Sequence, residues 1–347
     1  MRSSRSFFSP AVILVVGIWS SVTFAQGEGQ KDYSFCDVFT LQAENDEAGN
    51  SDRNYTSGFR YACTGSTPKL LSDLILSEGP PGSIQHSRTT YGIAHSTFTP
   101  GDLTRSDVIE DDQPYAGWLY FTLGLEWETI PKPDRLRYLD KLELQLGVIG
   151  PLSGAEQIQR TTHDILGATD PQGWDNQLEN EPGINLFYSR QWTGAQGLAP
   201  SPGEGWMPKL AFDVTPKVGL ALGNVHIFGA GGLMFRLGNF LPEDHGPPTL
   251  RPSLPGSDVF PRREGTSAYL FGGVEGRVVG RNVFLDGSTF DDDSPGVDKN
   301  RFVGEARVGA TLTIHNVRLS YTHVFRSREF RDERAQVYGA LTLSVAL

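Results

Sequence analysis

Two polar side chains, Gln159 and His163, stand four residues apart in a stretch whose sequence predicts a helix. Residues four apart lie side by side on one helix face, so the amide and the imidazole would point the same way. An imidazole exchanges protons near neutral pH, and an amide can orient a water molecule or a substrate. The pair is therefore a candidate for acid–base chemistry, although a lone histidine in a loop helix is more often ordinary polar surface.

Four further polar residues stand where predicted strands meet loops. Asn45 and Asp46 end the first predicted strand, Thr56 opens the second, and Arg105 lies in the connection 99–114. Each has an ordinary explanation. An Asn-Asp pair more often makes a turn than binds a metal, a threonine can hydrogen-bond within a strand end, and a loop arginine can contact solvent or anionic headgroups. These residues can act together only if the fold gathers them at one place.

The stretch 152–183 is the one long interruption that is expected to contain a helix. Ser153 followed by Glu156 predicts a capping box at its start, and Gly167 is a natural stop. A helix of about three turns follows from these limits. Gln159 and His163 are expected along the margin of its apolar face. That face would be formed by Ala155, Ile158, Thr162, Ile165 and Leu166.

The first 25 residues predict a secretory signal peptide. Arg2 and Arg5 precede the apolar run 11–19, and small residues follow up to Ala25. The formal net charge of the whole chain is −11, and no basic patch suited to nucleic acid is visible. We therefore expect an exported protein with no nucleic-acid partner.

Alternating apolar and polar residues fill most of the remaining chain, and this two-residue period predicts β-strands. Runs of about nine residues with charge on the second phase match transmembrane barrel strands. In a soluble sandwich the same apolar face would look inward, and phase alone does not separate the two folds. The signal peptide, the many evenly spaced strands and the final strand favour a barrel. The clearest runs are 119–127, 142–148, 306–314 and 341–347.

The expected fold is all-β: one domain, residues 26–347, forming a transmembrane antiparallel β-barrel of about twelve strands with a short helix in an extracellular loop. An even strand number places both termini on the periplasmic side, so the longest connections face outward. The segment 239–265, rich in Pro and Gly, is the exception and is expected to be a long periplasmic turn. The strands are expected at 34–44, 56–65, 88–98, 115–129, 137–149, 184–193, 208–221, 225–238, 266–280, 301–314, 317–326 and 335–347.

Cys36 and Cys63 could pair in an oxidising compartment. Cys63 shares the alternation of Phe59 and Tyr61, whereas Cys36 falls on the opposite phase from Phe39. Opposite phases argue against a disulfide unless a bulge intervenes.

Several familiar catalytic patterns are absent from the sequence. It contains no Gly-x-Ser-x-Gly, which argues against an α/β-hydrolase, and no His-Glu-x-x-His. No cysteine or histidine cluster has the spacing of a zinc site.

The first half of the chain nevertheless resembles the LpxR-type lipid A deacylase family of Gram-negative outer membranes. The resemblance implies a twelve-stranded barrel whose active site faces the outer leaflet, and calcium-dependent removal of the 3′-linked acyloxyacyl chains of lipid A. The matching pieces are Asn45-Asp46, Tyr55-Thr56-Ser57-Gly58, Phe98-Thr99-Pro100, Pro114-Tyr115-Ala116-Gly117-Trp118, Leu125-Glu126-Trp127, and Gly147-Val148-Ile149-Gly150-Pro151 running into Gln159 and His163.

Carried over by position, the resemblance implies a catalytic set made of His163, Gln159, Asn45, Thr56 and Arg105, with Asp46 as a ligand of Ca²⁺. His163 would activate a water molecule, and Gln159 would orient either that water or the substrate. Calcium, with Arg105 or Asn45 nearby, would stabilise the oxyanion. The expected partners are lipid A, or lipopolysaccharide, and the outer membrane, and the protein is expected to be a monomer.

Two alternative functions are also compatible with the sequence. One is a non-catalytic barrel, either a porin-like channel or a structural protein. The other is an outer-membrane phospholipase, which would differ in attacking a glycerophospholipid in place of lipid A.

Overall fold

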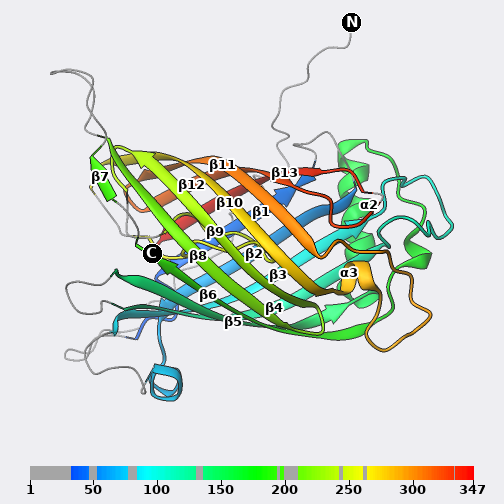
Figure 1. Ribbon diagram of the computed structural model, residues 1–347, viewed down its shortest axis with the longest axis horizontal. Coiled ribbons are helices and arrows are strands. Elements are labelled where there is room, and N and C mark those ends of the chain that lie inside the picture. Colours follow the sequence, from blue (N-terminus) through cyan, green and yellow to red (C-terminus); the bar gives the residue numbers. More distant parts are fainter. Residues whose placement is uncertain are drawn as a thin grey trace, which may run out of the picture. The chain divides into compact units, whose positions relative to one another are not determined.

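The two-residue alternation of the sequence produces long β-strands in the computed structural model (Figure 1). The structure describes residues 33–46, 53–76, 84–129, 136–193, 196–198, 210–241, 245–260, 264–331 and 333–347. All of these belong to one compact unit, Tyr33–Leu347. The predicted signal peptide, residues 1–25, lies outside the described residues.

Each predicted strand has a counterpart in the structure, and one short strand, β7, was not expected. The strands are β1 (Val38–Asn45), β2 (Asn54–Ser66), β3 (Ile84–Thr99), β4 (Ala116–Thr129), β5 (Tyr138–Ile149), β6 (Glu181–Trp192), β7 (Gln196–Leu198), β8 (Ala211–Gly223), β9 (His226–Gly238), β10 (Thr266–Asn282), β11 (Phe302–Ile314), β12 (Val317–Arg326) and β13 (Gln336–Ala346).

The helices are short. They are α1 (Lys69–Leu71), which continues into a π-helical turn Ser72–Leu76, then α2 (Ala155–Leu166), α3 (Val283–Asp286), and the 3₁₀ turns Pro151–Ser153 and Trp174–Asn176. Among the described helices, none combines the length and the apolar character needed to cross a bilayer.

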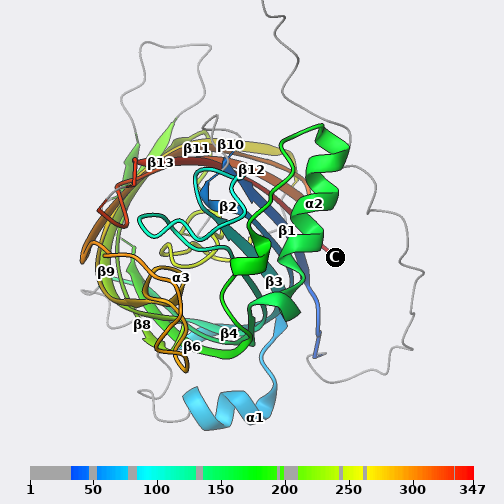
Figure 2. The same ribbon diagram turned by 90° about the vertical axis from the view of Figure 1, so that its right-hand side faces the viewer.

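The sheet closes on itself. Neighbouring strands pair antiparallel, β1 pairs with β13 so that Val38 faces Ala346, and β6 pairs with β8 so that Asn185 faces Gly223. The short β7 only extends the edge of β8. Figure 2 shows the resulting ring of strands. The predicted twelve-stranded antiparallel barrel is confirmed.

The barrel is polar inside and apolar outside. On β11, Glu305 and Arg307 are buried, whereas Phe302 and Val308, on the alternate phase, are exposed. A soluble sandwich would bury the apolar phase instead. The apolar phase therefore forms the outer surface, as in a membrane barrel.

The segment between β9 and β10 corrects the sequence interpretation. Residues 245–260 do not extend away from the barrel as a long turn but fold back into its interior (Figure 2). Asp258 accepts hydrogen bonds from Arg60 Nη1 and Lys141 Nζ, both at 2.6 Å, and Leu254 N donates to Glu275 at 2.9 Å. Charged groups that face the interior need partners there, and this segment supplies them.

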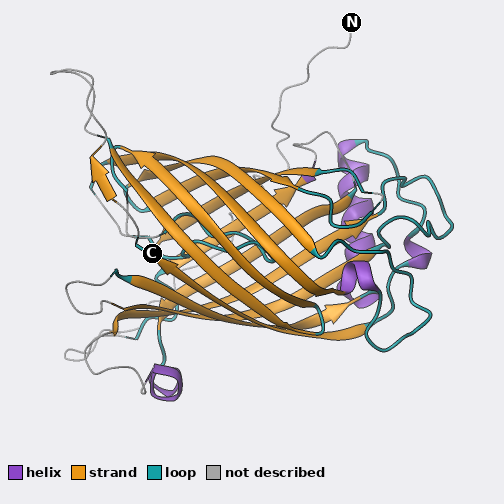
Figure 3. Cartoon of the chain, in the orientation of Figure 1, coloured by secondary structure: helices purple, strands orange, loops and turns teal. Residues whose placement is uncertain are grey.

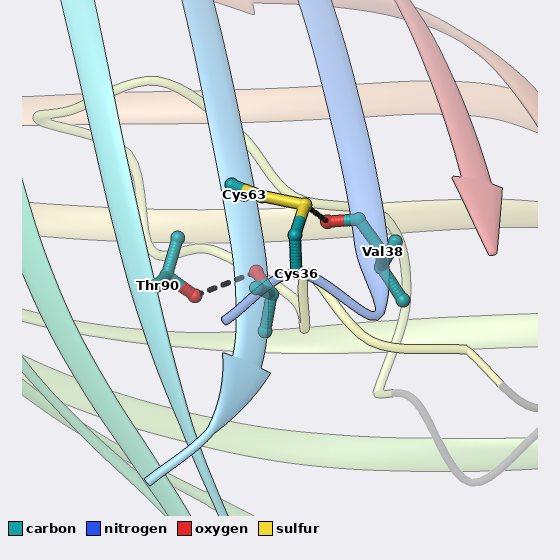
Figure 4. The surroundings of a disulfide bond; sticks show 5 residues. Cys36, Val38, Cys63 and Thr90 are labelled. Atoms are coloured by element: carbon teal, nitrogen blue, oxygen red, sulfur yellow. Dashed lines mark hydrogen bonds between the residues drawn. A yellow bond between two sulfur atoms is a disulfide. The ribbon is translucent and has the colours of Figure 1, made fainter. Parts of the chain in front are cut away.

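A disulfide between Cys36 and Cys63 also corrects the interpretation (Figure 4). Cys36 lies two residues before β1 begins, so the alternation of that strand does not fix the direction of its side chain. The two Cα atoms are 5.2 Å apart. The bond ties the segment that precedes β1 to β2.

The long connections gather at one end of the barrel, here called the α2 end. Their described residues are Asp46 and Arg53, 100–115, 150–180, 287–301, and 327–331 with 333–335, and α2 lies among them (Figure 1). The predicted site residues belong to the first three of these connections or to the strand ends beside them.

Candidate active site

Helix α2 begins later than the sequence predicts. Ser153 belongs to the preceding 3₁₀ turn, where its Oγ donates to the Gly150 carbonyl at 2.6 Å. Gly154, with a φ of 73° and no side-chain cap, leads into the helix, and Glu156 pairs with Arg160 at 2.9 Å. The expected capping box is therefore absent. The helix ends as predicted before Gly167, which has a left-handed φ of 65°.

The helix packs against the outer wall of the barrel. It contacts β3 and β4, and in Figure 2 it runs along the edge of the ring. On β4, Gly117 shares the outward phase of the exposed Phe121. A Cβ on Gly117 would lie 2.0 Å from Ser153 Oγ and 2.3 Å from Ala155 Cβ. Only glycine allows this close approach of helix and wall.

The buried side of α2 differs from the apolar face that the sequence predicts. Ala155, Gln159 and His163 are its buried residues. Ile158 is 37 % exposed and Ile165 is 66 % exposed. Gln159 and His163 therefore lie at the centre of the face that meets the barrel, not at the margin of an apolar face. The polar pair is enclosed between helix and wall.

A backbone carbonyl fixes the tautomer of His163. Its Nδ1 lies 2.5 Å from the carbonyl oxygen of Thr169, just beyond the end of the helix. A carbonyl can only accept, so Nδ1 carries a proton, and in the neutral imidazole the lone pair is then on Nε2. An imidazole in this state can accept a proton through Nε2.

A tryptophan fixes the amide of Gln159. Trp174 Nε1 donates to Gln159 Oε1 at 2.9 Å, which turns the amide nitrogen the other way. Gln159 Nε2 is buried and has no hydrogen-bond partner among the described residues. A buried donor without a partner is costly in a native structure unless it serves a ligand.

The loop that carries Trp174 is held against the connection 100–115. Leu178 N donates to the Tyr115 carbonyl and Gln172 N to the Leu103 carbonyl, both at 2.9 Å. The rings of Tyr115 and Trp174 lie 4.8 Å apart between centroids. Sequence reasoning did not identify Trp174 as part of the site, and the only signal was a tryptophan within a stretch rich in turn formers.

Asn45, Asp46 and Thr56 meet at the ends of β1 and β2. Asn45 Nδ2 donates to the Thr56 carbonyl at 3.3 Å, and Asp46 Oδ2 accepts from the backbone N–H of Arg53 at 2.8 Å. Thr56 is the extra residue of a bulge in the pairing of β2 with β3. Its hydroxyl lies 2.7 Å from that of Thr99 on β3. The bulge thus links this group to one of the strands that α2 covers.

Arg105 lies in the exposed loop 100–115, and its guanidinium pairs with the carboxylate of Asp107. The hydrogen bond from Arg105 to that carboxylate raises the pKa of the arginine and lowers the pKa of Asp107. The Arg105 carbonyl lies beside Gly173, where a Cβ would approach it to 2.9 Å. The structure therefore brings the Arg105 backbone next to the Trp174 loop but engages its charge with Asp107.

The oxygen atoms at the ends of β1 and β2 suit a hard cation. Asp46 supplies a carboxylate, Asn45 an amide oxygen, and Thr56 a hydroxyl and a carbonyl. Calcium prefers such ligands, whereas zinc sites are built mainly from cysteine and histidine. Within the described ranges, no three His, Cys, Asp or Glu side chains gather as a metal-binding group. The oxygen donors are therefore of the chemical type that calcium takes, with a single carboxylate among them.

Two cavities at the α2 end are lined by loop residues other than the six predicted ones. One, of about 130 Å³, lies between the loops 100–115 and 295–296, and Tyr115 and Gly173 are among the residues that line it. The other, of about 490 Å³, lies between Glu110, Asp298 and Arg331. Both belong to the loops, whereas the polar pair of α2 lies against the outer wall.

Comparison with known proteins identifies the family and the fold. The family model described as "Outer membrane protein LpxR" matches residues 11–347. The solved structure of LpxR from Salmonella typhimurium has 24 % sequence identity and a TM-score of 0.68, and the match covers 89 % of this chain and 100 % of that chain. The translocator domain of the autotransporter NalP from Neisseria meningitidis has 12 % identity and a TM-score of 0.35, covering 89 % and 87 %. Among curated proteins, none matches the chain.

The family match spans nearly the whole chain, and the barrel has the fold of the Salmonella protein. The resemblance found in the sequence motifs and the outer-membrane location are confirmed. This chain belongs to the LpxR family of outer membrane proteins.

Proposed function

We propose that this protein is a lipid A deacylase that hydrolyses the ester of the 3′-linked acyloxyacyl chains, with water as nucleophile and His163 as general base. The observation that carries the proposal is the pair formed by a tautomerically fixed imidazole and a partnerless amide donor, Gln159 Nε2, between α2 and the outer wall. Family membership supports the choice of substrate. A lipid can approach a site on the outer wall without passage through the barrel.

His163 would move one proton twice. With Nδ1 donating to the Thr169 carbonyl, Nε2 takes a proton from water while the water oxygen bonds to the ester carbonyl carbon. When the tetrahedral intermediate collapses, the C–O bond to the sugar breaks and Nε2–H returns the proton to the departing alkoxide. The products are the free fatty acid and the sugar hydroxyl, and one water is consumed.

Gln159 would donate a hydrogen bond from Nε2 to the substrate carbonyl or to the attacking water. Such a donor is most effective when it is oriented before the charge develops. Trp174 provides the orientation by holding Oε1, so it is a positioning residue.

Calcium, when bound by Asp46 with oxygens of Asn45 and Thr56, would supply positive charge that stabilises an oxyanion. Arg105 would attract the phosphates of lipid A. Its ion pair with Asp107 is exposed, and exposed ion pairs add little to the free energy of folding. Replacement of that carboxylate by a lipid phosphate would therefore cost little free energy.

A channel, the first of the alternative functions, has less support. The segment 245–260 occupies the barrel interior and is bonded to strands on several sides, as Asp258 shows with Arg60 and Lys141. An open pore of the porin type needs a water-filled lumen.

The proposal is tested with purified protein in detergent, offered either lipid A or a glycerophospholipid, first with calcium and then with EDTA. We expect loss of acyl chains from lipid A alone, and a large fall of the rate with EDTA that added calcium restores. Release of fatty acid from the glycerophospholipid instead would favour the phospholipase. Unchanged masses of both lipids would contradict the proposal.

A further inference from the structure

Helix α2 has three different sides. One is the buried side that meets the barrel wall. A second is charged, since Arg160 pairs with Glu156 at 2.9 Å and with Asp170 at 2.7 Å. The third is apolar and exposed, and is called here the apolar flank. It consists of Leu152, from the preceding turn, and Ile158, Ile165 and Leu166.

The direction of α2 relative to the strands indicates how its sides lie with respect to the membrane. Figure 3 shows α2 running across the long direction of the strands, close to their ends. Because the strands cross the membrane, a helix that runs across them lies roughly in the membrane plane. A helix with an apolar side and a charged side in this position is typical of one that lies in the bilayer interface.

The wall next to the helix is the lipid-facing surface. Ile93 on β3 and Phe121 on β4 point outward and are exposed, and they share the phase of Gly117, which touches the start of α2. The exposed apolar flank therefore belongs to a helix that packs on two strands whose outward side chains are also apolar and exposed. The charged side is bonded instead to Asp170, in the loop that docks on the connection 100–115.

We propose that the apolar flank of α2 contacts the acyl chains of the outer leaflet, so that the helix is a lipid-contact element and not a water-exposed cap. A second copy of the chain is a poorer occupant. A stable interface takes about 800 Å² from each partner, and four side chains on one short helix and the turn before it supply much less. The proposal does not depend on hydrolysis.

The test uses single cysteines labelled with a polarity-sensitive fluorophore. Cys36 and Cys63 form a disulfide, so the introduced thiol is the one that reacts. Ile165→Cys reports on the apolar flank, and Asp164→Cys, one residue away and exposed on another side, is its matched control. Ile158→Cys and Gln157→Cys form a second such pair. Each labelled protein is reconstituted in phosphatidylcholine vesicles with and without brominated acyl chains.

Contact with acyl chains predicts blue-shifted emission at 165 and 158, with bromolipid quenching roughly twofold or more above that of the controls. Equal quenching at flank and control positions would overturn the proposal. So would emission at 165 that changes with the protein-to-lipid ratio but not with bromination, since a second copy would then cover the flank. The disulfide and barrel assembly of each variant are checked by gel mobility before labelling.

Discussion

The barrel interior and the wall beneath α2 both bury polar side chains, yet they differ in chemistry. In the interior the groups are charged and face one another. Asp258 pairs with Arg60 and Lys141, and Glu305 pairs with Arg307 at 2.8 Å and Arg326 at 3.0 Å. Beneath α2 the buried groups include the Gln159 amide, whose Oε1 accepts a hydrogen bond from Trp174, and the His163 imidazole, whose Nδ1 lies against the Thr169 carbonyl.

The difference indicates what each region does. Opposite charges that neutralise one another inside the barrel hold the strands and the interior segment 245–260 together. Removal of one charge leaves its partners buried without compensation. Beneath α2, Trp174 holds Gln159 Oε1, and the buried Gln159 Nε2 has no hydrogen-bond partner among the described residues, so this donor is kept for a ligand. We therefore expect substitutions in the interior to change stability and substitutions beneath α2 to change catalysis.

The largest effect is expected for His163→Ala. Loss of the general base should lower kcat for lipid A by roughly 10²- to 10⁴-fold, with the free energy of unfolding nearly unchanged. Asp164→Ala, on an exposed side of the same helix, is the control and should keep its rate. The measurement is the rate of fatty acid release by purified protein, together with urea unfolding in the same detergent. Full activity in a folded His163→Ala protein would exclude the proposed base.

The opposite result is expected for Asp258→Ala. It leaves Arg60 and Lys141 uncompensated in the interior, which should lower the free energy of unfolding by about 3–5 kcal/mol. The folded fraction should keep its kcat, since Asp258 lies in the barrel interior and the proposed catalytic residues of α2 lie on the outer wall. Asp292→Ala, in an exposed loop, serves as the control for loss of an acidic residue. A stable Asp258→Ala protein with reduced kcat would reverse the comparison.

A smaller effect should follow from Trp174→Phe, which keeps an aromatic ring but cannot donate to Gln159. One hydrogen bond contributes about 0.5–1.5 kcal/mol, so kcat should fall roughly 2- to 12-fold with little change of KM. Gln159→Glu retains an oxygen for Trp174 but loses the N–H donors, and should lower kcat at least as much. Trp127→Phe controls for tryptophan loss elsewhere. An unchanged kcat in Trp174→Phe would remove the positioning role.

The strands could be predicted from the sequence because their two-residue period records which side chains face lipid and which face the interior. The same period does not say which face is inside, and burial of Glu305 and Arg307 settles that only in the structure. The position of the segment 245–260 inside the barrel could not be predicted. Its sequence has no regular alternation of apolar and polar residues, and its contacts are with residues distant in sequence. The disulfide was missed because Cys36 was assigned to a strand that begins two residues later.

The site was harder to predict than the fold. Gln159 and His163 were expected at the margin of an apolar face, but of the apolar residues on that face only Ala155 is buried, whereas Ile158, Ile165 and Leu166 are exposed. The capping box failed since Ser153 bonds backward to Gly150. Trp174 contacts Gln159, which is fifteen residues away in sequence, and no local sequence pattern predicts this contact. The roles of the six residues, the calcium ion and the monomeric state stay predictions.

The central claim, removal of an acyloxyacyl chain from lipid A, is tested most directly by the mass spectrum of lipid A from cells with and without this protein. The account predicts a species lighter by one acyloxyacyl group, present only when the protein is in the outer membrane, with the 2-linked chains intact. Identical spectra from the two strains, with the barrel correctly assembled, would contradict it.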